Sequence, residues 1–331
     1  MSASSEEWSM VTEAVRRLFD EVVAAAPDGH AVIGPQLEEL GWSDIEAEDP
    51  VAAAALLFTA QGRALAQTEI LDAAVQAELA AVLREPVDAV LLPAATTGEL
   101  RASKGGEISG IVLGPLHGPH GKIAAPVRAY AGRVSLHYIE IGNITRAVRS
   151  DTFDSSVHWT AVTAPVPAGG YEITQQWDLA LAAAQRGLAT ELIAVADAAL
   201  SAAVEHVSVR VQYGTAIGAM QSPRHALADA SARLEGARSL LDGAWRYGGS
   251  LAAMTAKAAA GRAHRAVIDA ALQVCGAIGL TSEHRLHRFA ARGLQLDALC
   301  GSAAQIEAQL AAQLFEPGKA GQALPTVLEW V

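Results

Sequence analysis

Apolar side chains recur at helical spacing in the first quarter of the chain. Between residues 8 and 26 they fall on one stripe, which is the pattern of an amphipathic helix. Asp49 followed by Pro50 has the residue types of an N-cap and a first helical position, so a helix is expected to begin there. Glu85-Pro86 interrupts the helical pattern. We expect helices over residues 8–26, 35–40, 50–66 and 70–83.

The pattern changes between residues 87 and 172, where β-branched residues alternate with polar ones and turn residues are frequent. Short alternating runs bounded by turn residues are typical of β-strands. Several such runs at close spacing favour a small antiparallel barrel or sandwich. The six expected strands cover residues 87–92, 108–113, 122–127, 133–139, 145–149 and 159–163.

Beyond Gly169-Gly170 the sequence becomes helical again, with few breaking residues. Long helices joined by short connections are typical of a four-helix bundle. The expected fold class is therefore mainly α with a small β domain. It comprises an N-terminal helical domain over 1–85, a middle β barrel or sandwich over 86–172, and a C-terminal four-helix bundle over 173–331. The bundle helices are expected over residues 175–211, 222–247, 249–279 and 300–315.

Composition narrows the class of function. Of the 331 residues, 51% are hydrophobic and 18% are charged, which is too few charges for a disordered chain. Much of the apolar content is alanine, which favours helices and buries little surface, so close packing or partner subunits must complete the core. The net charge of −12 argues against a nucleic-acid partner. Two cysteines make no disulfide framework; with a polar N-terminus and no membrane-length apolar run, we expect a cytoplasmic location.

Two short motifs about sixty residues apart carry candidate chemistry. The first is Arg210-Val211-Gln212-Tyr213-Gly214, at the end of the longest expected helix. A guanidinium there can bind a pyrophosphate through two hydrogen bonds and stays charged at any working pH. The alternative is a solvated arginine that interacts favourably with the helix C-terminus.

The second motif is Gln273-Val274-Cys275-Gly276-Ala277-Ile278-Gly279, at the end of the penultimate long helix. Its small residues allow a cofactor to approach the backbone, and the Gln273 amide can donate a hydrogen bond to it. The alternative is a glycine-rich helix C-terminus without a ligand.

Together the two motifs resemble flavin-binding signatures of the acyl-CoA dehydrogenase family, most strongly over residues 175–307. The resemblance implies an oxidoreductase with FAD as cofactor, in which the motif arginine reaches the FAD of a neighbouring subunit. Family members usually have phenylalanine at position 213 and glycine at position 277, and they have longer N-terminal and middle regions. The residues implied in cofactor binding are Arg210, Gln212, Tyr213, Gln221, Gln273, Gly276 and Ala277.

Neither of the two base positions of this family holds a carboxylate. Counting 27 residues on from Gln273 reaches the place of the glutamate that removes the α-proton of the thioester, and Cys300 stands there. The other base position, 26 residues before the motif arginine, is Ala184. The nearest acids on that helix, Asp178 and Glu191, lie about two turns away. A thiol in an apolar pocket is mostly neutral at pH 7, so Cys300 is interpreted as a packing residue and the isolated chain as inactive.

The family's Thr-Glu-Pro and Gly-Ser-Asp segment, which contacts the flavin ring, is not present in the corresponding stretch 91–98. The resemblance therefore implies a subunit that completes the FAD site of a homologous catalytic partner. Such subunits occur in α2β2 actinobacterial acyl-CoA dehydrogenases of steroid side-chain degradation, which pass electrons to an electron-transfer flavoprotein. Two alternatives remain: a self-sufficient homo-oligomer with an unrecognised base, and a flavin-free structural subunit.

Histidine pairs offer a weaker signal. His117-x-x-His120 and His284-x-x-His287 have a spacing that two metal ligands can use, but no third ligand is evident in the sequence. We therefore expect solvated histidines and no metal site. A solvated helix face is likewise expected for the basic group His264, Arg265, Arg285, Arg288 and Arg292.

Overall fold

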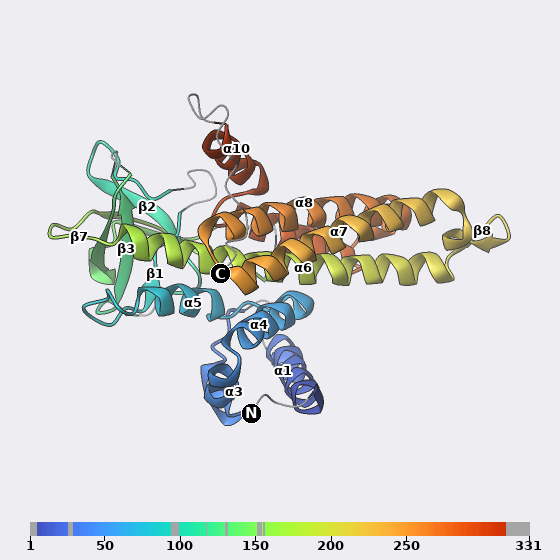
Figure 1. Cartoon of the computed structure of the whole chain (residues 1–331), viewed down its shortest axis with the longest axis horizontal. Coiled ribbons are helices and arrows are strands. Elements are labelled where there is room, and N and C mark those ends of the chain that lie inside the picture. Colours follow the sequence, from blue (N-terminus) through green and yellow to red (C-terminus); the bar gives the residue numbers. More distant parts are fainter. Residues whose placement is uncertain are drawn as a thin grey trace.

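In the computed structural model, long helices form a bundle with a β-rich region at one end and short helices along one side (Figure 1). The structure describes residues 5–25, 29–93, 99–116, 118–129, 132–150, 154 and 156–315. The element order is short helices, then strands, then long helices. The fold class is mainly α with a small β region, as the sequence pattern predicts.

The N-terminal helices bury their apolar stripes against one another and against the bundle. Asp49 caps the fourth of them as predicted, because its carboxylate accepts a hydrogen bond from the Ala52 N–H at 2.9 Å. The third was not expected. Gly41 takes a left-handed φ of 70°, and the chain turns there into a short helix that buries Trp42. The helices are α1 (Ser5–Ala25), α2 (Gly34–Glu39), α3 (Trp42–Glu48), α4 (Pro50–Ala64) and α5 (Ile70–Leu79).

The β-rich region contains two small sheets, with strand orders β1-β3-β4-β7 and β2-β6-β5. The expected barrel is therefore wrong and the sandwich is right. The sheets do not close into a barrel. Among the residues that the structure describes, the edge strands β7 and β5 each pair with a single neighbouring strand. Ile108 and Ile123, from different sheets, share one apolar core. The strands are β1 (Ala89–Val90), β2 (Glu107–Val112), β3 (Lys122–Arg128), β4 (Val134–Glu140), β5 (Arg146–Arg149), β6 (Thr160–Pro165) and β7 (Tyr171–Glu172).

One strand pair in the two sheets is parallel instead of antiparallel. β1 pairs with β3 in parallel, whereas the other strand pairs in the two sheets are antiparallel. Just beyond β1, Leu92 exchanges two backbone hydrogen bonds of 2.8 Å with Ile111 of the second sheet. The chain at residues 89–92 therefore joins the two sheets and holds them as one unit.

The described part of the C-terminal region contains one long central helix and four others. The expected helix over 249–279 ends at Cys275, because Gly276 takes a φ of 67° and a 3-10 helix, η3 (Gly276–Leu280), follows. Between the first two bundle helices the chain forms a two-stranded hairpin, β8 (Val211–Gln212) and β9 (Thr215–Ala216). The long helices are α6 (Thr174–Val209), α7 (Gln221–Tyr247), α8 (Ser250–Cys275), α9 (Leu286–Ala298) and α10 (Ala303–Leu314).

The sequence did not predict α9. This helix packs against α6 and α8, and it buries Leu286, Phe289 and Leu296 although many of its other residues are polar. The last predicted helix is confirmed as α10, which begins with a reciprocal capping box between Ser302 and Gln305. The chain therefore adds α9 to the bundle and places α10 outside it, against α8.

Helix α6 is the centre of the fold, since α4, α5, α7, α8 and α9 all pack against it. By length and composition it could cross a membrane, contrary to the sequence expectation, but two thirds of its most apolar window is buried inside the fold. Small residues allow its neighbours to approach closely. A Cβ on Gly187 of α6 would lie 2.5 Å from the ring of Phe58 of α4, so only glycine fits at this crossing.

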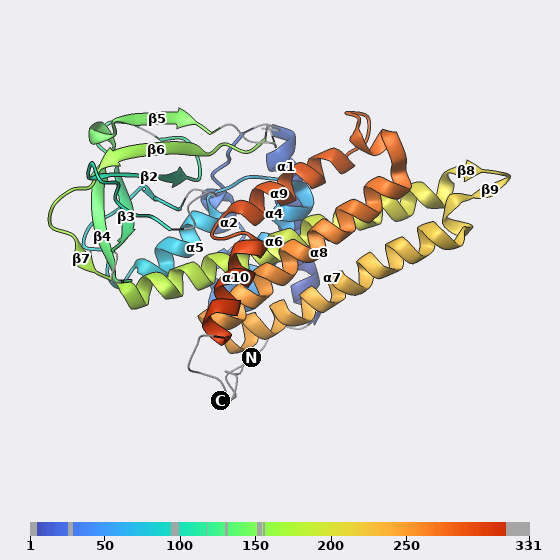
Figure 2. The same ribbon diagram turned by 90° about the horizontal axis from the view of Figure 1, so that it is seen from above.

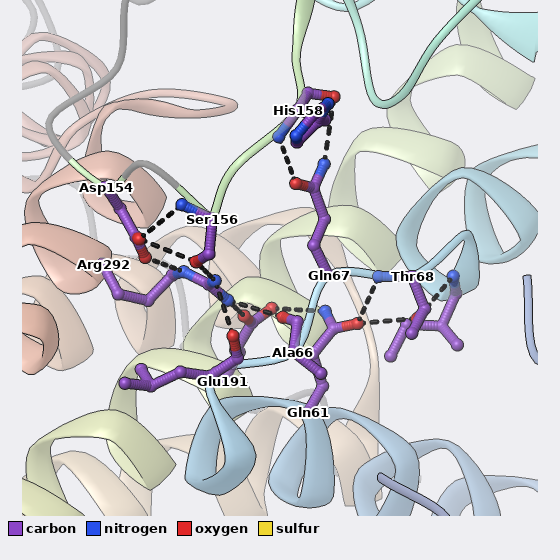
Figure 3. A network of polar contacts seen from close by, with 11 residues as sticks. Gln61, Ala66, Gln67, Thr68, Asp154, Ser156, His158, Glu191 and Arg292 are labelled. Atoms are coloured by element: carbon purple, nitrogen blue, oxygen red, sulfur yellow. Dashed lines mark hydrogen bonds and ion pairs between the residues drawn. The ribbon is translucent and has the colours of Figure 1, made fainter. Parts of the chain in front are cut away.

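A buried polar network joins the N-terminal helices, the β-rich region and the bundle (Figure 3). At its centre is Arg292 of α9, whose side chain is 2% exposed. Its guanidinium donates to the Asp154 carboxylate at 2.7 Å and to the Ser156 hydroxyl at 2.9 Å. It also donates to the backbone carbonyls of Leu65 at 2.8 Å and Ala66 at 2.6 Å. One side chain therefore holds together three segments that are far apart in the sequence.

Glu191 of α6 completes this network. Its carboxylate lies 3.4 Å from the Arg292 guanidinium and accepts a hydrogen bond from the Gln61 amide at 2.9 Å. Burial raises the pKa of Glu191. Burial alone would also raise the pKa of Asp154, but the positive charge of Arg292 and hydrogen bonds from neighbouring groups outweigh it, and the pKa is lowered. The expectation of a solvated face is wrong for Arg292 and His264, both of which are buried.

Candidate functional site

The connection between α9 and α10 places Cys300 in a cavity of about 350 Å³. Cys300 and Gly301 take left-handed φ values of 55° and 97°, so the chain turns sharply at this point. The β-rich region, α6, α8 and α10 all contribute to the cavity wall. Residues from these elements include Leu100, Arg128, Asp178, Gln185, Met254 and Gln309.

Of the two base positions named from the sequence, Cys300 lines this cavity, and Ala184 is the neighbour of Gln185, which also lines it. Gln185 of α6 donates a hydrogen bond from its amide to the backbone carbonyl of Cys300 at 3.2 Å. Ala184, the residue before it, is 1% exposed, and Ala182 lines the cavity wall. Gln185, next to residue 184, is thus brought to Cys300 by the packing of α6 on the α9–α10 connection.

The Cys300 thiol is not a base at neutral pH. Burial raises its pKa to about 12, although the nearby charge of Lys257 acts in the opposite direction. Lys257 is itself fully buried, and its ammonium donates to the backbone carbonyls of Asp297 at 3.0 Å and Gly301 at 3.2 Å. Burial lowers the pKa of Lys257. Since this side chain does not line the cavity, its role is to anchor the turn that carries Cys300.

Two carboxylates do line the cavity, and both contact one arginine. The Arg128 guanidinium lies 3.1 Å from the Glu99 carboxylate and 3.6 Å from that of Asp178. Glu99 also pairs with Arg101 at 2.6 Å. The sequence named Asp178 as a nearby acid but missed Glu99, because no local pattern shows that residue 99 reaches this cavity.

The first motif lies at the other end of the bundle, on the hairpin that projects from it (Figure 2). Tyr213 and Gly214 form its turn, with left-handed φ values of 52° and 81°. Tyr213 is 96% exposed, and Arg210 and Gln212 are exposed as well. These side chains therefore face outward from the chain.

The second motif comes to the same end. The Cys275 sulfur at the end of α8 lies within 4.8 Å of a ring nitrogen of His206, in the last turn of α6. His206 precedes Arg210 by one helical turn. The residues of the two motifs therefore lie at the same end of the bundle, and we call their exposed side chains the motif surface. Its other exposed members are Gln221, Gln273, Gly276 and Ala277.

The surface and the cavity are far apart. Asp178 and Arg210 stand near opposite ends of α6, and 32 residues of α-helix span about 48 Å. Because α6 is a single continuous helix, no side-chain movement brings the hairpin to this chain's own cavity.

Short helices, two small sheets and a long bundle in this order define the acyl-CoA dehydrogenase fold. Residues 177–314 match the family described as Acyl-CoA dehydrogenase, C-terminal domain. The acyl-CoA dehydrogenase IpdE2 of Mycobacterium tuberculosis is 28% identical over 305 residues, which cover 92% of this chain and 87% of that protein.

Solved structures agree with this assignment. A variant of the Tcur3481-Tcur3483 steroid ACAD matches with a TM-score of 0.75 at 18% identity, over 95% of this chain and 99% of that one. The ChsE4-ChsE5 complex of Mycobacterium tuberculosis matches with a TM-score of 0.70 at 17% identity, over 92% and 97%. The chain thus resembles the acyl-CoA dehydrogenase superfamily in sequence and fold, and its fold resembles that of steroid members.

Proposed function

We propose that the chain is a non-catalytic subunit of an FAD-dependent acyl-CoA dehydrogenase complex in the cytoplasm. The complex would introduce an α,β double bond into an acyl-CoA, and this chain would complete the FAD site of a homologous catalytic subunit. The distance of about 48 Å between the motif surface and the cavity carries the proposal, because it directs the motif residues toward another chain.

The motif surface fits one half of a flavin site. Arg210 offers an exposed guanidinium for a pyrophosphate, and Gln273 offers an amide beside small residues. Gly276 has open space where a side chain would stand, so a ligand can approach its backbone. FAD, when bound, accepts the hydride that leaves the acyl-CoA. The hairpin side chains would bind and orient its phosphates, and the partner would hold its other face.

The cavity supports the non-catalytic assignment. It has a neutral thiol at one family base position, and the other position is the buried Ala184, so neither residue offers a group to accept the α-proton. Its two carboxylates contact Arg128. The partner would supply the base, and an electron-transfer flavoprotein would reoxidise the complex. A CoA thioester with a steroid-type acyl group is the proposed substrate, in keeping with the steroid ACAD among the structural neighbours.

Replacing Arg210 by alanine is expected to weaken FAD retention in the assembled complex. Loss of a charge-assisted pyrophosphate contact costs about 1.5–3 kcal/mol of binding free energy. Flavin content after dialysis, measured by absorbance, checks this. The matched control is Arg233→Ala, which removes another exposed arginine twelve residues into α7 and should leave the flavin content unchanged. Equal flavin retention in both variants would show that Arg210 does not hold the cofactor.

Co-expression with the homologous catalytic subunit should give a hetero-oligomer with about one FAD for every two chains. The reason is that one of the two possible sites per pair lacks its flavin-ring residues. Native mass measurement and flavin quantitation test this stoichiometry. One FAD per copy of this chain in a pure homo-oligomer would instead support the self-sufficient enzyme. A stable complex without any flavin would support the structural-subunit alternative.

A further inference from the structure

Three side chains with metal-ligating atoms meet at the end of the bundle that carries the hairpin. His206 comes from the last turn of α6, Cys275 ends α8, and His284 lies in the connection that leads into α9. One ligand atom from each lies within 4.8 Å of the others. The rings of the two histidines meet edge to face, with centroids 5.9 Å apart.

We propose that His206, Cys275 and His284 bind a Zn²⁺ ion, with water in the fourth position. Zinc bonds of about 2.0–2.1 Å to nitrogen and 2.3 Å to sulfur place tetrahedral ligands roughly 3.4–3.6 Å apart. The ligand atoms now lie up to 4.8 Å apart. The most distant two must therefore move closer by little more than about 1 Å, and rotation of their side chains is enough for this. One thiolate and two imidazoles select zinc over Mg²⁺ or Ca²⁺, which prefer oxygen ligands. The histidines are only partly buried, so solvent can reach the fourth position.

The protonation states suit this ligand set. Burial lowers the pKa of His206, and the nearby His284 and Arg210 lower it further, which favours the neutral imidazole that a metal ligand requires. Burial raises the pKa of Cys275, so the free thiol keeps its proton. A bound cation stabilises the thiolate, and coordination releases this proton to solvent as the sulfur–zinc bond forms.

The neighbouring contacts define which histidines take part. The Nδ1 of His287 contacts the backbone carbonyl of His284 at 2.6 Å, so this ring positions the connection rather than joining the cluster. The Nδ1 of His284 accepts a hydrogen bond from the Leu286 N–H at 3.1 Å. If Nδ1 is the zinc ligand, its lone pair binds the metal and this hydrogen bond is lost. The sequence pair His284-x-x-His287 is thus not the proposed ligand set. Its missing partners come from α6 and α8.

A metal at this point would tie together the ends of α6 and α8 and the start of α9. It would fix the base of the hairpin, because His206 is one helical turn from Arg210. The inference does not depend on the proposed function, since it rests on three ligand atoms and not on flavin or a partner.

The test is equilibrium dialysis of the full chain against Zn²⁺ and, separately, Co²⁺, with metal analysis and absorbance spectra. We expect one ion per chain, a thiolate-to-cobalt charge-transfer band, and a higher melting temperature with Zn²⁺. Substitution of a residue that only hydrogen-bonds to a metal ligand typically weakens metal binding by roughly 10–100-fold. Loss of a ligand itself should weaken Zn²⁺ binding by more than this in each of three variants, His206→Gln, Cys275→Ser and His284→Gln. His287→Gln is the matched control and should keep the ion.

Circular dichroism of each variant without metal establishes that it is folded before its metal binding is compared. Absence of stoichiometric metal in the folded wild-type chain would overturn the proposal. So would a cobalt spectrum without the thiolate band, or Zn²⁺ binding that survives in Cys275→Ser. Loss of metal in all three ligand variants, with retention in His287→Gln, would support it.

Discussion

The chain purified alone is expected to show no dehydrogenation of acyl-CoA thioesters above background. General-base catalysis is typically worth roughly 10²–10⁴-fold in rate, and Cys300 and Ala184 stand at the two positions where the family resemblance predicts the base. The pKa of about 12 for Cys300 leaves almost no thiolate at pH 7 to replace it. Reduction of an artificial electron acceptor by the isolated chain, compared with the co-expressed complex, measures the effect.

Two conservative substitutions in the complex sharpen this experiment. Glu99 and Asp178 are the carboxylates that line this chain's cavity, and Glu99→Gln and Asp178→Asn remove their charge with little change in shape. Both variants should keep the turnover of the complex. A large loss in either one, together with turnover by the isolated chain, would identify an unrecognised base and contradict the non-catalytic assignment.

Replacing Arg292 by alanine is expected to lower the free energy of unfolding by about 3–5 kcal/mol, because it leaves buried carboxylates without their cation. Asp154 and Glu191 both lie against this guanidinium, at 2.7 and 3.4 Å. The substitution also removes donors to the Leu65 and Ala66 carbonyls, which join the N-terminal helices to the bundle. Arg292→Lys keeps the charge but not the planar set of donors, so an intermediate loss is expected.

Urea unfolding of the variants, followed by circular dichroism, measures these differences. The matched control is Arg262→Ala, which removes an exposed arginine paired with Glu307 and should change the midpoint little. If Arg292→Ala unfolds at the same urea concentration as this control, the network does not hold the segments together.

The local pattern of the sequence was sufficient to predict most helices and strands. Periodicity and capping residues predicted α4 with its Asp49 cap, the long helix α6 and six of the seven strands in the two sheets, because these signals depend on neighbours within a few residues. Helix α9 was missed since its apolar residues are interspersed with a histidine and two arginines, which suggested a solvated stretch. Contact of Arg210 and Gln273 with FAD stays a prediction.

By itself, the sequence determined the order of helices, strands and bundle, the two motifs, and the lack of a carboxylate at residues 184 and 300. Tertiary structure decided what these residues do together. It joined Gln185 and Cys300 at one cavity, buried Arg292 among three segments, and grouped His206 with Cys275 and His284. The physical reason is that periodicity records which face of an element is buried. Which distant segment covers that face depends on packing along α6, which no local pattern encodes.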